Sequence, residues 1–175
     1  KYKNLNFVFN PEFLTERKAR LDFINTARIV LGGSEEDCDK VEELYRQRFP
    51  FTPVIKTDFA TAQLIKYMAN CFFAVKVSYM NEMKQICDAA GANWDDALHG
   101  FITDGRIGNS HIDVPGHDGD CGFGGKCFPK DLNAIMHMAE DLGIKPLLLK
   151  SAWEKNLEVR THYDWSEIKG AVSED

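Results

Sequence analysis

The pattern of apolar and polar positions predicts two kinds of structure in succession along the chain. Within residues 1–57, three short apolar runs at 5–9, 27–31 and 53–56 predict strands. Between the last two runs, residues 35–49 carry apolar side chains at helical spacing and predict a helix. Strands that alternate with helices are typical of a parallel sheet, and three strands indicate the end of such a sheet.

A much longer helical pattern follows. Apolar residues recur at intervals of three and four from residue 58 to residue 90, and Gly91 then ends the helix. Further apolar residues lie off this stripe, so the helix needs cover on more than one side. Because a chain of 175 residues supplies little cover, we expect a homodimer through the helix at residues 58–90. The alternative is a central helix wrapped by its own neighbours.

The last part of the chain is predicted to be helical around one long loop. Helical patterns cover residues 94–101, 129–142 and 146–160, and residues 161–175 are expected to be a solvated tail. Residues 102–125 are rich in Gly, Asp, His and Asn and have almost no apolar pattern. Loops of this length inside a compact domain are usually functional or disordered. The predicted fold is therefore mainly α with a small α/β portion.

Composition and charge exclude several classes of protein. The net charge is −6 and no run of Lys and Arg is present, which argues against a nucleic-acid partner. We expect no membrane association, because no apolar stretch is long enough to span a bilayer and no secretory signal opens the chain. Five cysteines at irregular spacing fit a reducing compartment better than a disulfide framework, and indicate a cytoplasmic protein.

Cys127 is the strongest candidate for chemistry. It follows the glycine-rich run 122–125, whose glycines allow positive φ and the close approach of a ligand. Pro129 then stands where a helix would begin. A thiol just before a helix N-terminus, with Lys126 and Lys130 nearby, is placed where the pKa of a cysteine can fall and the thiol become a nucleophile. The alternative is a buried structural cysteine after a glycine turn.

Two pairs of polar residues are further candidates. Lys66 and Asn70 are four apart on the long helix, so they share one face and are suited to hold an anion or oxyanion. Taken alone, this pair has a better structural explanation. The aliphatic part of the Lys66 side chain would lie along the edge of the core, and its ammonium group would remain in water. Glu12 and Glu16 follow Pro11, and on a helical turn they would suit general-base work. Taken alone, these acids are better explained as complementing a helix dipole.

A metal site is only weakly indicated, and we expect none. His111, His117, Cys121 and Cys127 are residue types that bind zinc, but their spacing is irregular and lacks a Cys-x-x-Cys pair. A common phosphate-binding loop follows a strand and ends in Gly-Lys-Ser or Gly-Lys-Thr. The run 122–125 has neither feature. It is better suited to form a flexible backbone wall against a sugar.

Four stretches occur in an order and at a spacing that are specific in combination. They are Asn10-Pro-Glu-Phe-Leu14, Leu64-Ile-Lys-Tyr-Met-Ala-Asn70, Arg106-Ile-Gly-Asn109 and Gly122-Phe-Gly-Gly-Lys-Cys-Phe-Pro-Lys-Asp131. Together they resemble the nucleotide-sugar dehydrogenases of the UDP-glucose and GDP-mannose dehydrogenase family. The resemblance runs from about Phe7 to Arg160. Lys126 departs from it, because a small residue, often Ser, is expected before the cysteine.

The resemblance implies a domain organisation. Residues 1–57 would be the end of a Rossmann-like NAD-binding domain, and residues 58–160 a central domain that provides catalytic residues and dimer contacts through its long helix. Residues 161–175 would be a tail. Because the family's Gly-x-Gly-x-x-Gly motif is absent from the sequence, no residue is assigned to cofactor binding and the chain is expected to be inactive alone.

The resemblance also implies a reaction. A primary alcohol on the sugar becomes a carboxylate, with two NAD and one water, and UDP-glucose is the favoured substrate. Cys127 would attack the intermediate aldehyde to form a thiohemiacetal, which is oxidised to a thioester and cleaved by water. Lys66 and Asn70 would stabilise the oxyanion, and Asp131 would transfer a proton near Cys127.

Further roles follow from the same resemblance. Glu12 matches the acid associated with thioester hydrolysis, with Glu16 as its partner. Arg106 matches an arginine that reaches the nucleotide sugar across the dimer interface. The residues assigned to substrate binding are Phe13, Leu14, Arg106, Phe123, Gly124 and Gly125.

The sequence leaves other functions open. Within the family, GDP-mannose or a UDP-N-acetylhexosamine is an alternative substrate. A different class is a non-catalytic module for dimerisation and nucleotide-sugar binding, and a third is a zinc-stabilised helical domain.

Overall fold

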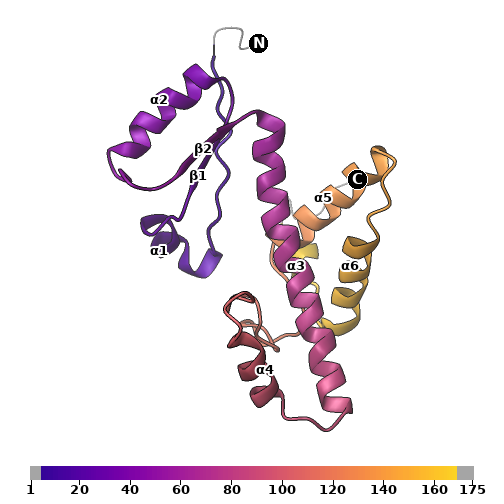
Figure 1. Cartoon of the computed structure of the whole chain (residues 1–175). Coiled ribbons are helices and arrows are strands. Elements are labelled where there is room, and N and C mark those ends of the chain that lie inside the picture. Colours follow the sequence, from indigo (N-terminus) through magenta and orange to yellow (C-terminus); the bar gives the residue numbers. More distant parts are fainter. Residues whose placement is uncertain (1–4, 169–175) are drawn as a thin grey trace. The chain divides into compact units, whose positions relative to one another are not determined.

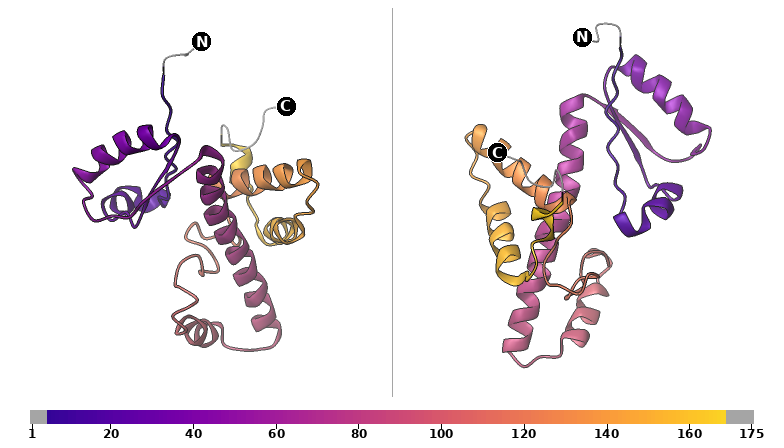
Figure 2. Two further views of the ribbon diagram at one scale, coloured as in Figure 1. Left: turned by 45° about the horizontal axis from the view of Figure 1, so that its top comes forward. Right: turned by 180° about the vertical axis from the view of Figure 1, so that it is seen from behind.

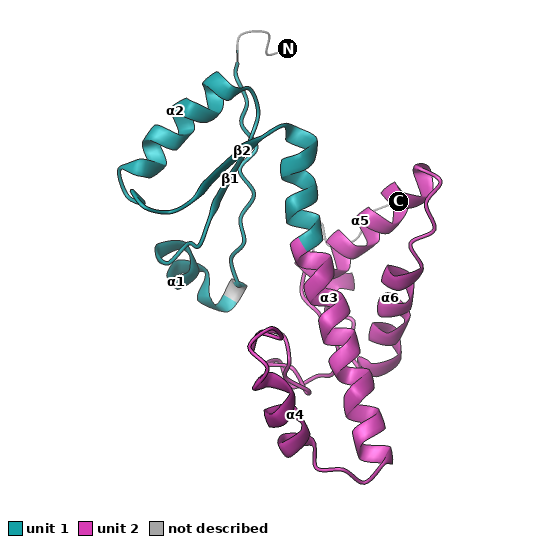
Figure 3. Ribbon diagram, in the orientation of Figure 1, with its two compact units in different colours: residues 1–68 teal, residues 69–175 magenta. Residues whose placement is uncertain are grey.

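The computed structural model describes residues 5–168 and divides the chain into two compact units, Lys1–Met68 and Ala69–Asp175 (Figure 3). Each unit has its own hydrophobic core. The structure is mainly helical and has one two-stranded parallel sheet in its described part. The predicted fold class is therefore confirmed.

The first unit contains a β-α-β arrangement. Strand β1 (Ile29–Gly32) pairs in parallel with β2 (Val54–Thr57), and helix α2 (Glu35–Arg46) connects them (Figure 1). All residues of β1 are buried, as expected for a continuous apolar run in a parallel sheet. Ser34 caps α2, because its side chain accepts a hydrogen bond from the Asp37 amide.

The prediction of a strand over residues 5–9 is wrong. Only Phe9 pairs, in an isolated antiparallel bridge with Gly32, whereas Leu5 and Phe7 are exposed. The apolar run is therefore only partly buried, through Val8 and Phe9, and Val8 packs against the core of this unit. A 3-10 turn η1 (Glu16–Lys18) and a short helix α1 (Ala19–Ile24), which the pattern did not predict, follow this segment.

Helix α3 (Phe59–Ala89) confirms the predicted long helix to within one residue at each end. Asp58 supplies its cap, since the Asp58 carboxylate accepts the Thr61 amide at 2.9 Å. Gly91 follows the helix at a φ of +67°, a conformation that favours glycine. No helix in the described part is both long enough and apolar enough to cross a bilayer.

In the second unit, helices pack around the part of α3 that follows Met68. Helices α5 (Cys127–Asp141) and α6 (Leu147–Val159) lie along one side of α3, and α4 (Trp94–Ile102) lies beside its C-terminal half on the other side (Figure 2). The Ser78 hydroxyl donates to the Ala152 carbonyl at 2.7 Å and ties α3 to α6. The buried core contains Cys71, Ala74, Val77, Phe123, Leu132 and Met136.

Residues 161–168 are not the solvated tail that the polar pattern predicts. They include the 3-10 turn η2 (Asp164–Ser166), in which Trp165 is only 5% exposed and lies 5.4 Å from the Trp153 ring. A large aromatic ring gains stability from burial, which explains why this short stretch folds back. Residues 169–175 lie outside the described part.

Candidate functional site

Cys127 is the first residue of α5, and its side chain is exposed. The helix thus begins two residues before Pro129, where the sequence predicts its start, and Pro129 lies in the first turn. Proline is tolerated there because the first amides of a helix have no partner within it. The alternative of a buried structural cysteine is therefore wrong, since the thiol is open to a substrate or reagent.

Asp131 lies four residues further along α5, on the same face as Cys127, and is 3% exposed. Its Oδ2 accepts a hydrogen bond from Nδ2 of Asn70, on α3, at 2.5 Å. Its Oδ1 pairs with the ammonium group of Lys130. A buried carboxylate is costly unless it is hydrogen-bonded, so Asn70 and Lys130 explain how Asp131 is held near the proposed nucleophile.

A second thiol, that of Cys71, lies near this carboxylate. Cys71 follows Asn70 on α3 and is buried. Burial, with a smaller contribution from the negative charge of Asp131, raises the pKa of Cys71 to about 12. Because the thiolate is the reactive form of a cysteine, Cys71 stays unreactive at neutral pH.

The first unit contains three further predicted site residues, Lys66, Glu12 and Glu16. Nζ of Lys66 lies 2.9 Å from Oε1 of Glu12 and 2.5 Å from the Glu12 carbonyl oxygen. Glu12 is in an irregular segment before η1, so the prediction that it shares a helical turn with Glu16 is wrong. Glu16 begins η1. Lys66 and Asn70 are four residues apart on α3, as predicted, and each contacts a carboxylate, Lys66 that of Glu12 and Asn70 that of Asp131.

Phe13 and Leu14 are half-buried, and their segment is well anchored. The guanidinium of Arg28 lies over the Phe13 ring, 4.0 Å from its centre. The Leu14 amide donates to Oε2 of Glu12 at 2.7 Å. Arg28 was not identified from the sequence. It could have been noticed as a charged residue directly before a buried apolar strand.

Arg106 lies in the loop after α4, and 88% of its side chain is exposed. It forms an ion pair with Asp104, with 2.9 Å between Nε and Oδ1. Hydrogen bonds from Arg106 lower the pKa of Asp104. The guanidinium is thus held at the surface, where it is accessible to an anionic ligand.

The glycine-rich run before Cys127 is a rigid turn. Gly122 and Gly125 have φ values of +71° and +70°, which favour glycine. Phe123 is buried in the core, with only 4% of the residue exposed. Sequence reasoning missed three side chains that hold this run, those of Asn81, Asn156 and Asp164. Asn81 and Asn156 are buried in helices. The only hint in the sequence is a polar residue at a helix position that the apolar spacing places in the core.

The loop histidine is explained by packing. His111 stacks on Phe73 with 4.1 Å between ring centres, and its Nδ1 is buried without a partner in the described part. Burial, followed by the positive charge of Lys76, lowers the pKa of His111. Among residues 5–168, no three side chains of His, Cys, Asp or Glu are grouped so that they could hold a metal ion, so the zinc alternative has no structural support.

The two glycines at the end of β1 do not form an open cradle for a dinucleotide. A Cβ on Gly32 would lie 2.6 Å from the Ala62 Cβ, and one on Gly33 would lie 3.1 Å from the Phe7 carbonyl oxygen. The chain itself therefore fills this space. We assign no residue of the described part to NAD.

Comparison with known families matches both parts of the chain. Residues 60–158 match the central domain of the UDP-glucose/GDP-mannose dehydrogenase family. Residues 1–49 match the NAD binding domain of the same family.

Individual relatives agree with these matches. The UDP-glucose 6-dehydrogenase TuaD of Bacillus subtilis (strain 168) is 36% identical over 159 residues, which are 91% of this chain and 33% of the relative. The structure of a UDP-glucose dehydrogenase from Pyrobaculum islandicum is similar with a TM-score of 0.74 and 30% identity, and the match covers 87% of this chain and 34% of that one.

A relative named for another sugar nucleotide is also similar. The GDP-mannose dehydrogenase from Pseudomonas aeruginosa matches with a TM-score of 0.52 and 29% identity, over 87% of this chain and 34% of that one. The chain spans about a third of the length of the curated relatives it matches.

Proposed function

Because the chain belongs to the UDP-glucose/GDP-mannose dehydrogenase family, we propose that it provides the thiol chemistry for the NAD-dependent oxidation of a nucleotide sugar, UDP-glucose to UDP-glucuronate. NAD is the cofactor indicated by the family's NAD binding domain, which residues 1–49 match. The observation that carries the proposal is the exposed Cys127 at the start of α5, followed on the same face by the buried Asp131. UDP-glucose is preferred because several of the relatives are named for it.

The proposed reaction converts a primary alcohol to a carboxylate with one water. Two molecules of NAD, when bound, would each accept one hydride and so take up the four electrons. After the first oxidation, Sγ of Cys127 bonds to the aldehyde carbon and the carbonyl oxygen gains a proton, which gives a thiohemiacetal. Loss of a hydride and a proton then gives a thioester. Water adds to the thioester carbon, and the carbon–sulfur bond breaks to release carboxylate and thiol.

Five of the predicted side chains are assigned roles in these steps. Asp131 is suited to hold or move a proton on the face of α5 that carries Cys127, and Asn70 fixes its orientation. Lys66 would stabilise the oxyanion together with Asn70. The accessible carboxylate of Glu12 would assist the water that cleaves the thioester, with Glu16 as the second acid.

Substrate binding is assigned to a smaller set. The exposed guanidinium of Arg106 is suited to pair with the phosphates of the nucleotide, because its planar fork matches their oxygens. Phe13 and Leu14 are proposed to contact the substrate, as is the glycine-rich run with Phe123, Gly124 and Gly125.

We propose that the protein is a homodimer through α3. A row of apolar side chains at helical spacing is exposed along this helix: Leu64, Met68, Phe72, Tyr79, Met83 and Ile86. Exposed apolar side chains in such number on one helix mark an interaction site, and a second copy would cover them. Arg106 would then act on the substrate bound by the partner. The five cysteines, free in the described part, favour a cytoplasmic location.

The test is the number of NADH molecules formed per UDP-glucose consumed by the full-length gene product. We expect two, and we expect Cys127→Ser to abolish formation of UDP-glucuronate. Cys87→Ser is the matched control, because Cys87 is a half-buried thiol at the far end of α3.

Other substrates separate the remaining alternatives. NADH formed from GDP-mannose or a UDP-N-acetylhexosamine in place of UDP-glucose would correct the substrate and keep the family chemistry. No NADH from any of these sugars would overturn the proposal and favour a non-catalytic module for dimerisation and nucleotide-sugar binding.

A further inference from the structure

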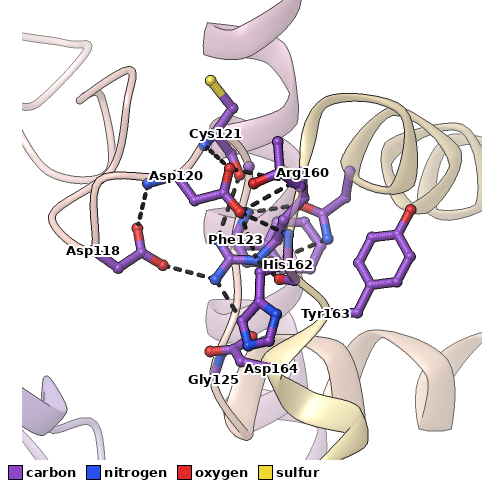
Figure 4. Close-up of polar contacts among 12 residues, drawn as sticks. Asp118, Asp120, Cys121, Phe123, Gly125, Arg160, His162, Tyr163 and Asp164 are labelled. Carbon is purple, nitrogen blue, oxygen red and sulfur yellow. Dashed lines mark hydrogen bonds and ion pairs between the residues drawn. The ribbon is translucent and has the colours of Figure 1, made fainter.

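Arg160 is buried directly after α6 and is surrounded by acceptors. Only 3% of its side chain is exposed, and its guanidinium lies 2.7 Å from a carboxylate oxygen of Asp118, 3.3 Å from Asp164 and 3.9 Å from Asp120 (Figure 4). It also donates to the carbonyl oxygens of Cys121 and His162, at 3.3 and 2.9 Å. A buried guanidinium is stable only when its donors are satisfied in this way. We call Arg160 and the three aspartates the Arg160 clasp.

The aspartates of the Arg160 clasp extend its contacts to the backbone. Asp120 accepts the amides of Cys121, Thr161 and His162 at 2.8 to 3.0 Å, so it joins the loop before α5 to the segment after α6. Burial raises the pKa of Asp120, but these backbone hydrogen bonds outweigh it and lower the pKa. The carboxylate is therefore ionised at neutral pH, as its contacts require.

The same network holds the glycine-rich run. Oδ2 of Asp164 accepts the Gly125 amide at 3.0 Å. Asn156, which is fully buried, pairs with both backbone groups of Phe123: its Oδ1 accepts the amide at 2.7 Å and its Nδ2 donates to the carbonyl at 3.0 Å. Asn81, on α3, accepts the Gly122 amide at 3.1 Å. Side chains from three elements thus fix this backbone immediately before the thiol.

The glycines of the run are needed for this contact. A Cβ on Gly124 would overlap the guanidinium of Arg160, and one on Gly122 would overlap the amide of Asn156. The backbone of the run therefore lies against the clasp and its neighbour. Glycine is therefore required at positions 122 and 124 by packing within the protein, whether or not a ligand also approaches this backbone.

We propose that the Arg160 clasp is a positioning device: it fixes the backbone of residues 122–125 and, through it, the first turn of α5, which presents Cys127. Arg160 and its aspartates are positioning residues, because they act through the loop. The proposal rests on the proposed function only for the catalytic role of Cys127.

The experiment compares two variants with wild type. Arg160→Lys keeps the positive charge but cannot present the planar fork that contacts three carboxylates and two carbonyls. Asp164→Ala removes the acceptor of the Gly125 amide from a partly exposed position, and so provides a milder test if Arg160→Lys folds poorly. The matched control is Arg46→Lys, since Arg46 also pairs with a glutamate and two carbonyls, but on α2.

Amide hydrogen exchange of the 175-residue chain is the first readout. In both clasp variants we expect exchange at Gly125 and at Lys130, whose amide donates to the Lys126 carbonyl at 3.4 Å, to be faster by about tenfold, while amides in the middle of α3 keep their wild-type rates. Arg46→Lys should leave all of these rates unchanged. Wild-type exchange at Gly125 and Lys130 in both clasp variants would overturn the proposal.

Turnover by the full-length gene product is the second readout. We expect kcat to fall by about a hundredfold in Arg160→Lys, with a smaller rise in KM, because the thiol is misplaced rather than lost. A mobile loop with wild-type kcat would overturn the proposal. If the wild-type protein forms no NADH, the proposed function fails, and hydrogen exchange at Gly125 and Lys130 alone decides whether the clasp holds the start of α5.

Discussion

The carboxylates of Asp131 and Glu12 have opposite surroundings. Asp131 is 3% exposed, lies in a helix, and has a buried amide and an ammonium group as partners. The Glu12 side chain is 54% exposed, lies in an irregular segment, and contacts Lys66 at the surface of its unit. The first arrangement holds a carboxylate in one orientation, whereas the second leaves it open to water. The two environments are compatible with the roles we propose, a fixed proton carrier for Asp131 and an acid that assists water for Glu12.

The largest effect is expected from Asp131→Ala. The substitution removes the carboxylate and leaves the buried amide of Asn70 without its partner, so the free energy of unfolding should fall by about 3 kcal/mol. Urea denaturation of the 175-residue chain measures it. Asp141→Ala, at the exposed end of the same helix, is the control and should change stability by less than about 0.5 kcal/mol. Equal losses of stability for the two variants would contradict the claim that the contacts of the buried Asp131 stabilise the fold.

Asn70→Ala should have the next largest effect, a loss of about 2 kcal/mol. Asp131 would keep Lys130 as a partner but lose a buried donor. If Asn70 acts through Asp131, the loss in the double variant Asn70→Ala/Asp131→Ala is smaller than the sum of the two single losses. Additive losses would show that the hydrogen bond contributes nothing to stability.

The pH dependence of stability should report the low polarity around Asp131. The pKa of Cys71 is raised to about 12, above the 9.0 of an unperturbed thiol, so the folded state retains a proton that the unfolded state loses. The contribution of Cys71 to stability is therefore full below pH 9 and is lost as the pH rises toward 12. Melting curves of wild type and Cys71→Ala should diverge in this window, with the steeper decline in wild type. Parallel curves would indicate that the thiol is solvated.

Lys66→Met should have the smallest effect. A salt bridge to an exposed carboxylate contributes little, so we expect a change of about 0.5 kcal/mol in the free energy of unfolding. Urea denaturation of the same chain measures it. A loss above about 2 kcal/mol would show that the ion pair between Lys66 and Glu12 contributes as much to stability as the buried contacts of Asp131.

The elements with clear periodicity could be predicted from the sequence. The apolar spacing of α3 gave both of its ends, and Gly91 gave its stop, because these signals are local. The strand predicted at residues 5–9 is wrong for the opposite reason. A short apolar stretch does not show whether other parts of the protein cover it, and here Leu5 and Phe7 are exposed. Burial of Trp165 also depends on a partner far away in the sequence, Trp153.

The candidate site shows the same division. The place of Cys127 between a glycine turn and a helix could be predicted, because these signals are local. No spacing rule predicts that Asn70 faces Asp131, and those residues could be grouped only through the family resemblance. Arg160 was missed altogether, because a single arginine after a helix has no local pattern and its aspartates come from two segments that only the fold brings together.

The contact between Gly124 and Arg160 also limits how this protein can change over generations. A Cβ at position 124 would overlap a guanidinium nitrogen of Arg160 and would lie 2.5 Å from a carboxylate oxygen of Asp164. A side chain at position 124 therefore needs both of these residues to shorten or move. Substitution of Gly124 alone is expected to be rare among homologous sequences that keep Arg160 and Asp164.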